Sequence, residues 1–259
     1  MAATFTLWYK HMKKFRANPM EMYGLAIQPI LWVVLFGVGM KSMMGPGMHG
    51  GGDAYVTFMV PGIVALSALG GAVGGGSVWL TERLRGIVKE YLAAPIPRLS
   101  ILMGNALSTM TKSLFQASII LIVGLLMGAK LGANPLGWLG GLVLVAGYGL
   151  GFSGVALATA SSTDNPGAYH SMIMLLNLPL LFLSNALYPL ESLPTWMRVG
   201  ALINPTSYVI DGVRQMMLKD GAALAGGEVL SLWLCFVVVA VFAALGMWMA
   251  YGAFKNSLK

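Results

Sequence analysis

The chain has 259 residues, of which 57% are hydrophobic and 10% are charged, and its mean hydropathy is +0.76. A soluble domain carries about 25% charged residues and a disordered chain is polar, so both classes are excluded. The single cysteine, Cys235, excludes an internal disulfide framework, and the net charge of +7 comes from basic residues beside apolar runs, which act as topology signals rather than as a nucleic-acid surface. We therefore expect an all-α integral membrane protein that forms one domain over residues 1–259.

The polar N-terminal segment predicts a helix at about residues 4–16 that lies in the membrane interface. Its aromatic and apolar side chains fall on one helical face, and its lysines lie largely elsewhere, as expected at an interface. The aromatic and apolar residues are Phe5, Trp8, Tyr9, Met12 and Phe15, and the lysines are Lys10, Lys13 and Lys14. Two interpretations stay open: the helix only anchors the chain, or it also transmits force from a cytoplasmic partner.

Six apolar runs follow, and each is long enough to cross a bilayer, which takes roughly 20 residues. They predict six transmembrane helices near Tyr23–Met43, Tyr55–Leu80, Ile101–Met127, Leu136–Ala160, Ala168–Leu187 and Val229–Phe254. The first connection, at 45–53, is rich in glycine and is expected to be a flexible turn.

The second connection, at about 81–98, combines charge with an apolar stripe. Leu84, Ile87, Val88, Tyr91 and Leu92 follow helical spacing, and Glu82, Arg83, Arg85, Lys89 and Glu90 occupy the other face. Ala94-Pro95 ends the predicted helix, because a residue before proline avoids the helical region. Such a helix fits the groove of a partner protein, and the alternative is a solvated turn that carries topology charges.

The long segment before the last span, at about 188–228, predicts a helical hairpin that dips into the outer leaflet. Pro194–Ile203 forms one short helix, and Asn204-Pro205 begins a second one as N-cap and first helical residue. Asp211 and Arg214 are three residues apart and are expected to pair on the helix surface.

The lysines and arginines divide unequally between the two sides of six alternating spans. Ten lie on the side of both termini and five on the other side, and Lys112 falls inside the third span near its start. The excess places both termini in the cytoplasm.

The spans contain few polar side chains. Ser67, Asn177, Ser184 and Asn185 are candidates for a substrate pathway, and the alternative for each is a hydrogen bond to a neighbouring helix. Three GxxxG pairs (Gly70 with Gly74, Gly71 with Gly75, Gly147 with Gly151) indicate closely packed helices and are consistent with a homodimer. We expect no ionisable residue clearly at mid-membrane depth.

Catalytic and cofactor motifs are not found. The chain lacks a Walker A sequence, its two GxGxxG matches do not lie in a strand–helix unit, and its histidines lack metal-ligand spacing. We expect no catalytic residue, no metal and no cofactor in this chain.

Thr81–Asn105 resembles the first cytoplasmic loop of type-2 ABC transporter permeases, through Glu82, Arg83, Gly86, Leu92, Pro95 and Arg98. The segment Ile203–Leu218 resembles a second hallmark of that family, through Asn204, Pro205, Tyr208, Asp211 and Arg214. The resemblance covers essentially the whole chain and is strongest to the drug-resistance and nodulation-factor export branch. The glycine-rich loop departs from the family pattern.

The resemblance implies a permease that works by alternating access and lies in the lipid bilayer of a bacterial or archaeal plasma membrane. It would assemble with a second copy of itself or with a related permease. Two separate ATPase subunits would bind ATP and Mg, and Thr81–Ala94 would be the coupling helix that contacts them. The coupling residues would be Glu82, Arg83, Arg85, Gly86, Ile87, Tyr91, Pro95 and Arg98, and the hairpin would close the outer end of the pathway. Substrates of that branch are hydrophobic drugs, lipids and lipid-linked sugars.

Three rival functions are considered. A polysaccharide or glycolipid exporter would line its pathway with aromatic rings. An ion-coupled secondary transporter would need ionisable residues at mid-membrane depth. A membrane-embedded enzyme would need a catalytic cluster at the end of a span, and none is found in the sequence.

Overall fold

The computed structural model describes residues 2–43, 51–132, 134–187, 190, 193–218 and 230–256, and the side chains of residues 40–43 and 51–54 fall outside the description. The predicted glycine-rich loop lies largely outside the described residues, as do residues 188–189, 191–192 and 219–228 of the segment at 188–228. In the part that is described, the chain is helical apart from turns and one isolated antiparallel bridge between Leu131 and Leu218. The prediction of an all-α protein is confirmed.

Ten helices are described. They are α1 (Ala2–Ala17), α2 (Pro19–Met43), α3 (Gly51–Leu84), α4 (Ile87–Ala93), α5 (Arg98–Leu126), α6 (Pro135–Ser161), α7 (Pro166–Phe182), α8 (Thr195–Ile203), α9 (Pro205–Met217) and α11 (Leu232–Asn256). The ends of the helices follow from local sequence. Asn134, Asn165 and Asn204 each cap a helix whose first residue is proline, with the side-chain oxygen accepting a backbone N–H.

Five helices, α2, α3, α5, α6 and α11, are long and apolar enough to span a membrane. The fifth predicted span is shorter than expected, because α7 ends at Phe182 rather than near Leu187. Pro179 lies in its last turn, and Asn204 donates hydrogen bonds to the carbonyl groups of Leu180 and Leu183, which replaces further helical pairing. A buried irregular segment at 184–187 continues the path of the chain.

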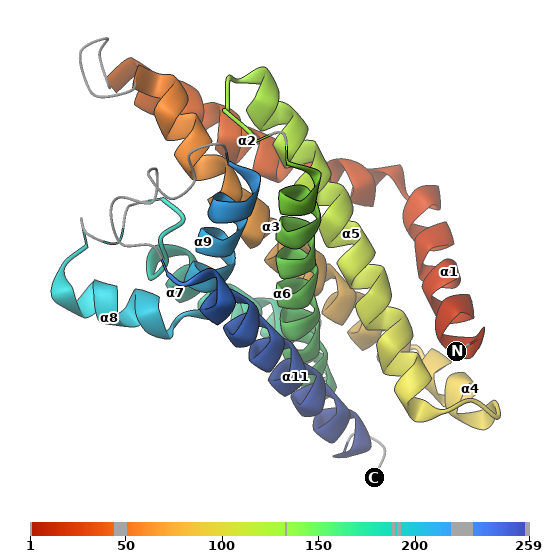
Figure 1. Cartoon of the computed structure of the whole chain (residues 1–259). Coiled ribbons are helices and arrows are strands. Elements are labelled where there is room, and N and C mark those ends of the chain that lie inside the picture. Colours follow the sequence, from red (N-terminus) through yellow and green to blue (C-terminus); the bar gives the residue numbers. More distant parts are fainter. Residues whose placement is uncertain are drawn as a thin grey trace.

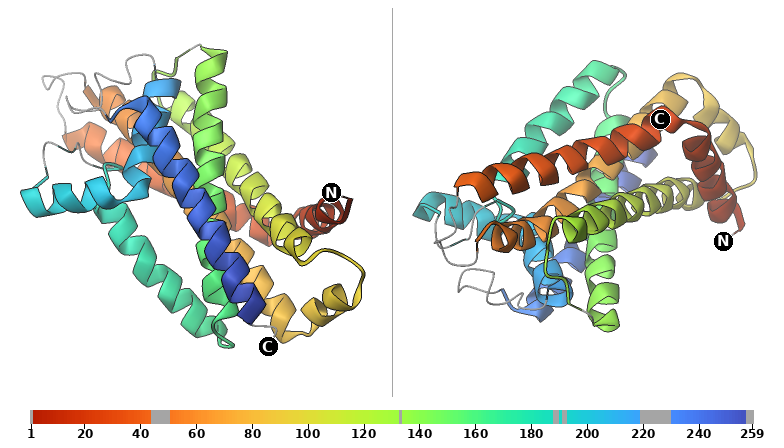
Figure 2. Two further views of the ribbon diagram at one scale, coloured as in Figure 1. Left: turned by 60° about the horizontal axis from the view of Figure 1, so that its bottom comes forward. Right: turned by 90° about the horizontal axis from the view of Figure 1, so that it is seen from above.

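The long helices alternate in direction. The α6–α7 turn, α4 and the last turn of α11 gather at one end of the molecule, and the α5–α6 turn lies at the opposite end (Figures 1 and 2). We call these the α4 end and the opposite end. Helix α3 runs through the centre, and 83% of its most apolar window is buried, against 17% for α2 and for α11.

Glycines bring helices of this one chain close together. A Cβ at Gly154 of α6 would lie 2.1 Å from the carbonyl carbon of Gly246 of α11, and one at Gly71 of α3 would lie 2.3 Å from Ser113 Oγ of α5. Gly75 and Gly151 pack in the same way, against Thr109 and Phe242. The GxxxG pairs are therefore largely used inside the protomer, so they do not support a homodimer as the sequence suggested.

Candidate functional site

Side chains from three helices meet at the α4 end. Lys10 of α1 forms an ion pair with Glu82 of α3, with 2.8 Å between Nζ and Oε1, and Tyr91 of α4 donates to Oε2 of Glu82 at 3.2 Å. Lys10 also donates to the Tyr91 hydroxyl. The Glu82 side chain is 4% exposed and that of Lys10 is 41% exposed. This Lys10–Glu82–Tyr91 cluster ties α1 to the end of α3 and to α4.

Burial and charge act in opposite directions on Lys10. Burial lowers the pKa of Lys10, whereas the hydrogen bonds to Glu82 and Tyr91 and the charge of Glu82 raise it. The raising effects together exceed that of burial, so the pKa lies above its ordinary value and Lys10 keeps its charge. Burial lowers the pKa of the adjacent His11 to about 4. His11 is therefore neutral at pH 7 and belongs, with Leu7 and Phe15, to the buried face of α1, which packs along α5.

The predicted aromatic face of α1 is divided in the structure. Phe5 and Tyr9 are exposed, whereas Phe15 is buried and Trp8 donates to the Thr111 hydroxyl of α5 at 3.0 Å. A helix with an exposed aromatic edge still suits a membrane interface. The prediction that these aromatic side chains share one face was wrong. Leu7, His11 and Phe15, which are four residues apart, are the side chains that pack on α5, and Phe5 and Tyr9 therefore point outward.

The predicted Thr81–Ala94 helix is two helices. Residues up to Leu84 form the last turn of α3, and Gly86, with φ of 79°, breaks the chain before α4 begins at Ile87. Glycine adopts this left-handed conformation without steric cost. The predicted apolar stripe is consequently divided as well, with Val88 buried at 4% exposure, Ile87, Tyr91 and Leu92 half-buried, and Leu84 47% exposed.

Arg83 points toward the turn between α6 and α7. Its guanidinium donates to the carbonyl oxygens of Ser161 and Thr163 and pairs with Asp164 at 2.7 Å. Arg83, Glu82 and Tyr91 are thus engaged within the chain, and the sequence placed both Glu82 and Arg83 on the polar face.

An exposed surface remains at the α4 end. We define it as the coupling surface, and its residues are Leu84, Arg85, Lys89, Glu90, Ala93, Pro95 and Arg98, with half-buried Ile87 beside it. Of the predicted coupling residues, Arg85, Pro95 and Arg98 lie on this surface, and Gly86 provides the turn that presents it.

A cavity of about 600 Å³ lies between α2, α3 and α7, with one side chain from α5. Two of the four predicted pathway residues, Ser67 and Asn177, line it together. The other lining residues are Glu21, Gly24, Leu25, Gln28, Pro29 and Trp32 of α2, Ile63, Leu66, Gly70 and Val73 of α3, Gln116 of α5, Met174, Leu178 and Leu181 of α7, and Leu187 after it. We call it the α2–α3–α7 cavity.

Gln116 contributes an unusual polar group to this cavity. Pro29 lacks the N–H that would pair with the carbonyl of Leu25 in a regular helix, and Gln116 Nε2 donates to that oxygen instead, at 2.7 Å. Gln116 is 4% exposed, and its Oε1 has no hydrogen-bond partner. The sequence analysis missed Gln28 and Gln116, although an amide within an apolar run is a signal of an intramembrane polar site.

Glu21 and Lys112 form an ion pair beside the cavity, with 2.5 Å between Oε1 and Nζ. Lys112 lies at the middle of α5 rather than near its start, and its Nζ lies 4.9 Å from the centre of the Phe15 ring. Glu21 lies in the first turn of α2 and Phe15 belongs to α1, so the middle of α5 meets the segments that precede the first span. The expectation that no ionisable residue lies clearly at mid-membrane depth stays a prediction. The charge of Lys112 is tolerated because α1 and α2 cover it and supply its counter-charge.

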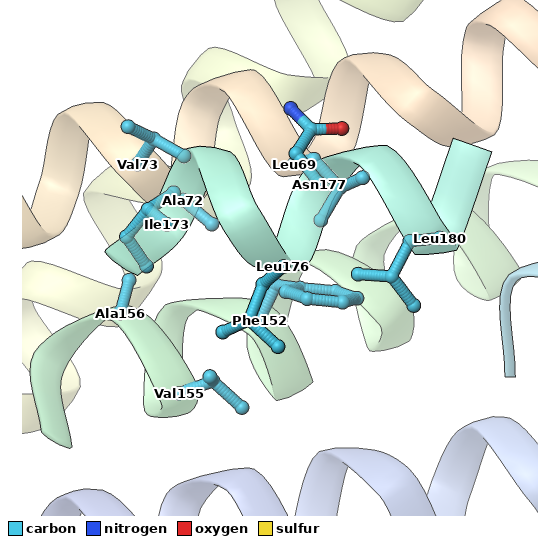
Figure 3. A pocket seen from close by; sticks show the side chains of 10 residues that line it. All are labelled: Leu69, Ala72, Val73, Phe152, Val155, Ala156, Ile173, Leu176, Asn177 and Leu180. Carbon is cyan, nitrogen blue, oxygen red and sulfur yellow. The ribbon is translucent and has the colours of Figure 1, made fainter. Parts of the chain in front are cut away.

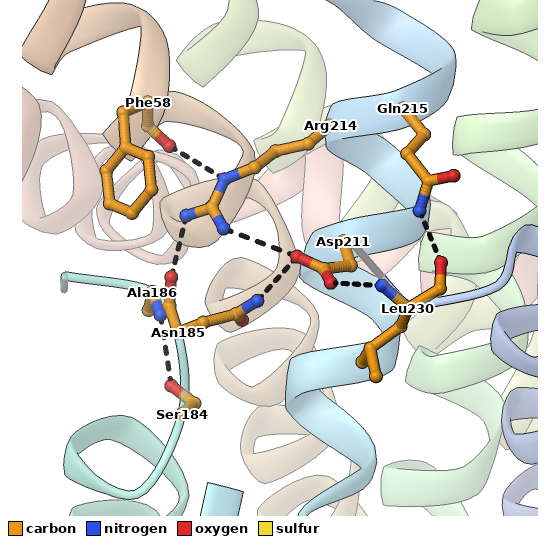
Figure 4. Close-up of polar contacts among 8 residues, drawn as sticks. All are labelled: Phe58, Ser184, Asn185, Ala186, Asp211, Arg214, Gln215 and Leu230. Atoms are coloured by element: carbon orange, nitrogen blue, oxygen red, sulfur yellow. Dashed lines mark hydrogen bonds and ion pairs between the residues drawn. The ribbon is translucent and has the colours of Figure 1, made fainter. Parts of the chain in front are cut away.

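Helix α9, which belongs to the predicted hairpin, is held by a buried network at the opposite end (Figure 4). Arg214 of α9 donates to the carbonyl oxygens of Phe58 (3.2 Å) and Asn185 (2.6 Å), pairs with Asp211 at 3.5 Å, and stacks on the Phe58 ring at 3.8 Å. Asn185 Nδ2 donates to Asp211 at 2.6 Å. Arg214 and Asp211 are 0% and 1% exposed, so the expected surface pair is in fact buried. We call this group the Arg214 network.

The remaining predicted residues of this region serve local structure. Asn204 caps α9, Pro205 is its first residue, and Tyr208 donates to the carbonyl of Leu202. Ser184 is buried and donates to the carbonyl of Leu181. Ser184 and Asn185 therefore do not line the α2–α3–α7 cavity, unlike Ser67 and Asn177.

A second, very small crevice of about 10 Å³ lies between α3, α6 and α7 (Figure 3). Its lining is apolar except for Asn177, whose amide points away from Phe152 and Val155 (Figure 3). The crevice has room for about one water molecule and is a packing defect rather than a binding site.

The sequence is similar to those of known transport proteins. The family model described as ABC-2 type transporter matches residues 2–218. The chain is 34% identical over 201 residues to ycf38 of Porphyra purpurea, which is named as a transport permease, with 76% of this chain and 67% of the relative covered. It is 24% identical over 249 residues to the daunorubicin resistance ABC transporter permease protein DrrB1 of Streptomyces coeruleorubidus (95% and 85% covered), and 27% identical over 203 residues to nodulation protein J of Rhizobium leguminosarum bv. trifolii (76% and 74% covered).

Proposed function

This chain belongs to the ABC-2 type transporter family, as a multi-pass membrane permease, and we propose that it exports amphipathic molecules, driven by a separate ATPase. The observation that carries the proposal is the α2–α3–α7 cavity, whose walls are apolar and whose polar groups are few. A cavity of about 600 Å³ suits a drug-sized molecule, because ligand pockets typically measure about 300–1,000 Å³.

The ATPase would bind the coupling surface. Its movement would reach α1 through the Lys10–Glu82–Tyr91 cluster and α7 through the Arg83 contacts at the α6–α7 turn. ATP and Mg would be bound by two copies of that partner. The membrane would be the bacterial or archaeal plasma membrane, with the α4 end and both termini in the cytoplasm.

A second copy of the chain, or a related permease, would complete the pathway by alternating access. This proposal is supported by the exposure of α2 and of α7, the two helices that flank the cavity and leave it open at the side of the protomer. Among the described lining residues of the cavity, Trp32 is the aromatic one. A track of aromatic rings, which would favour a polysaccharide exporter, is therefore not supported there.

The coupling surface provides the test. Leu84→Asp and Ile87→Asp place a charge where an ATPase cleft would bury an apolar side chain. Loss of that burial costs roughly 1.5–3 kcal/mol, and an unpaired buried charge costs more. Both variants should insert normally but lose co-purification with the ATPase and transport of a dye. Lys13→Asp, an exposed change on α1, is the matched control. Full ATPase binding and transport by both variants would show that this surface does not couple.

A further inference from the structure

Three polar side chains that line the α2–α3–α7 cavity, those of Gln116, Ser67 and Glu21, present hydrogen-bond acceptors to it. The clearest case is Gln116. Its Nε2 donates to the Leu25 carbonyl at 2.7 Å, so the amide cannot rotate without placing two oxygens against each other. Its Oε1 is buried and unpartnered, at the cavity wall that Gly70 of α3 leaves free of a side chain. A buried acceptor without a partner is costly, and a donor brought by a ligand would remove that cost.

Ser67 and Glu21 also present hydrogen-bond acceptors to the cavity. The Ser67 hydroxyl donates to the Val64 carbonyl at 2.6 Å, so its oxygen lone pairs are what it offers to the cavity. Glu21 lines the cavity with a carboxylate that is 26% exposed, whereas Lys112, its counter-charge, is 6% exposed and does not line it. The charged group of this ion pair that a ligand would contact is therefore the carboxylate.

The amides of Gln28 and Asn177 can donate or accept, so they set no preference. The rest of the lining is mostly apolar, from Trp32, Leu66 and Met174 among others. Buried acceptors discriminate strongly against ligands that cannot donate, and a carboxylate discriminates against an anion.

We propose that this cavity selects amphipathic molecules whose polar end donates hydrogen bonds, lipophilic amines above all, and rejects molecules whose polar end is an anion such as a carboxylate or phosphate. Gln116 and Glu21 are the specificity-determining residues. The inference rests on the proposed function, since it assigns the substrate class of the same cavity.

The inference can be tested with three fluorescent probes that share one polycyclic aromatic body. One ends in a primary amine, one in a hydroxyl and one in a carboxylate. Binding to the complete permease–ATPase complex in lipid nanodiscs, and stimulation of its ATP hydrolysis, would be measured for each. The expected order of affinity is amine, then hydroxyl, then carboxylate, with at least tenfold between the first and the last.

Gln116→Leu removes the acceptor and should weaken amine binding about tenfold while leaving carboxylate binding unchanged. Because this change also leaves the Leu25 carbonyl unpaired, Gly70→Ser is the second variant. It keeps the Gln116–Leu25 bond and offers Oε1 a donor within the chain, so it should cause the same selective loss. Leu66→Ala should weaken all three probes alike, and Ser118→Ala, on the exposed side of α5, should change none.

The outcomes separate the two proposals. Equal binding of the three probes, a preference for the carboxylate, or unchanged selectivity in both Gln116→Leu and Gly70→Ser would overturn the specificity inference and leave the export function standing. If no probe binds or stimulates ATP hydrolysis, the proposed function fails and the inference fails with it.

Discussion

The two charged groups at opposite ends of α3 differ in how completely they leave water. In the Arg214 network both charges are buried, and the guanidinium is held by two backbone carbonyls, a carboxylate and an aromatic ring. In the Lys10–Glu82–Tyr91 cluster the carboxylate is buried but the ammonium is 41% exposed. Water can therefore replace Lys10 as a partner, whereas nothing can replace Arg214. The α4 end is built to rearrange at lower cost than the opposite end.

The largest effect is expected at Arg214. Arg214→Met leaves Asp211 buried without its counter-charge and should lower the free energy of unfolding by about 3–5 kcal/mol. Arg214→Lys should recover little, because one ammonium cannot reach the Phe58 and Asn185 carbonyls in the fork geometry of arginine. Thermal unfolding in detergent would measure both. Lys89→Met, an exposed change, is the control, and a similarly small loss in all three variants would contradict the comparison.

Acid should loosen the α4 end through His11. The pKa of His11 is lowered by burial to about 4, against 6.5 in the unfolded chain, so the unfolded state binds a proton first as the pH falls. Stability is therefore full above pH 6.5 and is lost toward pH 4, by about 2 kcal/mol between pH 7 and pH 5. Hydrogen exchange of α1 at the two pH values measures it. In His11→Gln this part of the pH dependence should disappear, and its persistence would assign it to another group.

Glu82→Gln sharpens the comparison directly. It removes the charge that holds Lys10, but Lys10 can turn to water, so we expect a loss of about 1–2 kcal/mol. A double-mutant cycle with Lys10→Met should give a coupling free energy of about 1 kcal/mol or less, as for partly exposed pairs. A loss as large as that of Arg214→Met would mean that the two ends are equally rigid.

An effect no larger than that of Glu82→Gln is expected at the break between α3 and α4. Gly86→Ala introduces a side chain at φ of 79°, which costs roughly 1–2 kcal/mol. No atom of the described residues lies within 4 Å of the added Cβ, so the cost should come from the backbone alone. We expect a small decrease in melting temperature together with weaker ATPase binding, because α4 would be presented at another angle. Gly74→Ala, also without contact but in a regular helix, should have neither effect.

The sequence predicted the helices that depend on local signals, but it did not predict contacts between residues far apart in the chain. Apolar runs and Asn-Pro caps were sufficient for the long helices and for α8 and α9. Periodicity alone could not reveal that Glu82 turns inward, because its partner Lys10 lies 72 residues away. The cavity depends on Glu21, which precedes the apolar run, and on Gln116, whose role follows from a carbonyl that Pro29 leaves unpaired on another helix.

The prolines also bear on how the protein can bend. Pro29, Pro61 and Pro179 lie inside α2, α3 and α7, the three helices that wall the cavity, while α5, α6 and α11 have no proline beyond their first turn. Each interior proline removes one rung of the helical hydrogen-bond ladder and so lowers the resistance to bending at that point. The bundle thus combines three helices that resist bending, α5, α6 and α11, with three that bend more easily at an interior proline, α2, α3 and α7. Changes in the volume of the cavity can be accommodated by the helices that bend more easily, while the contact between α6 and α11 stays as it is.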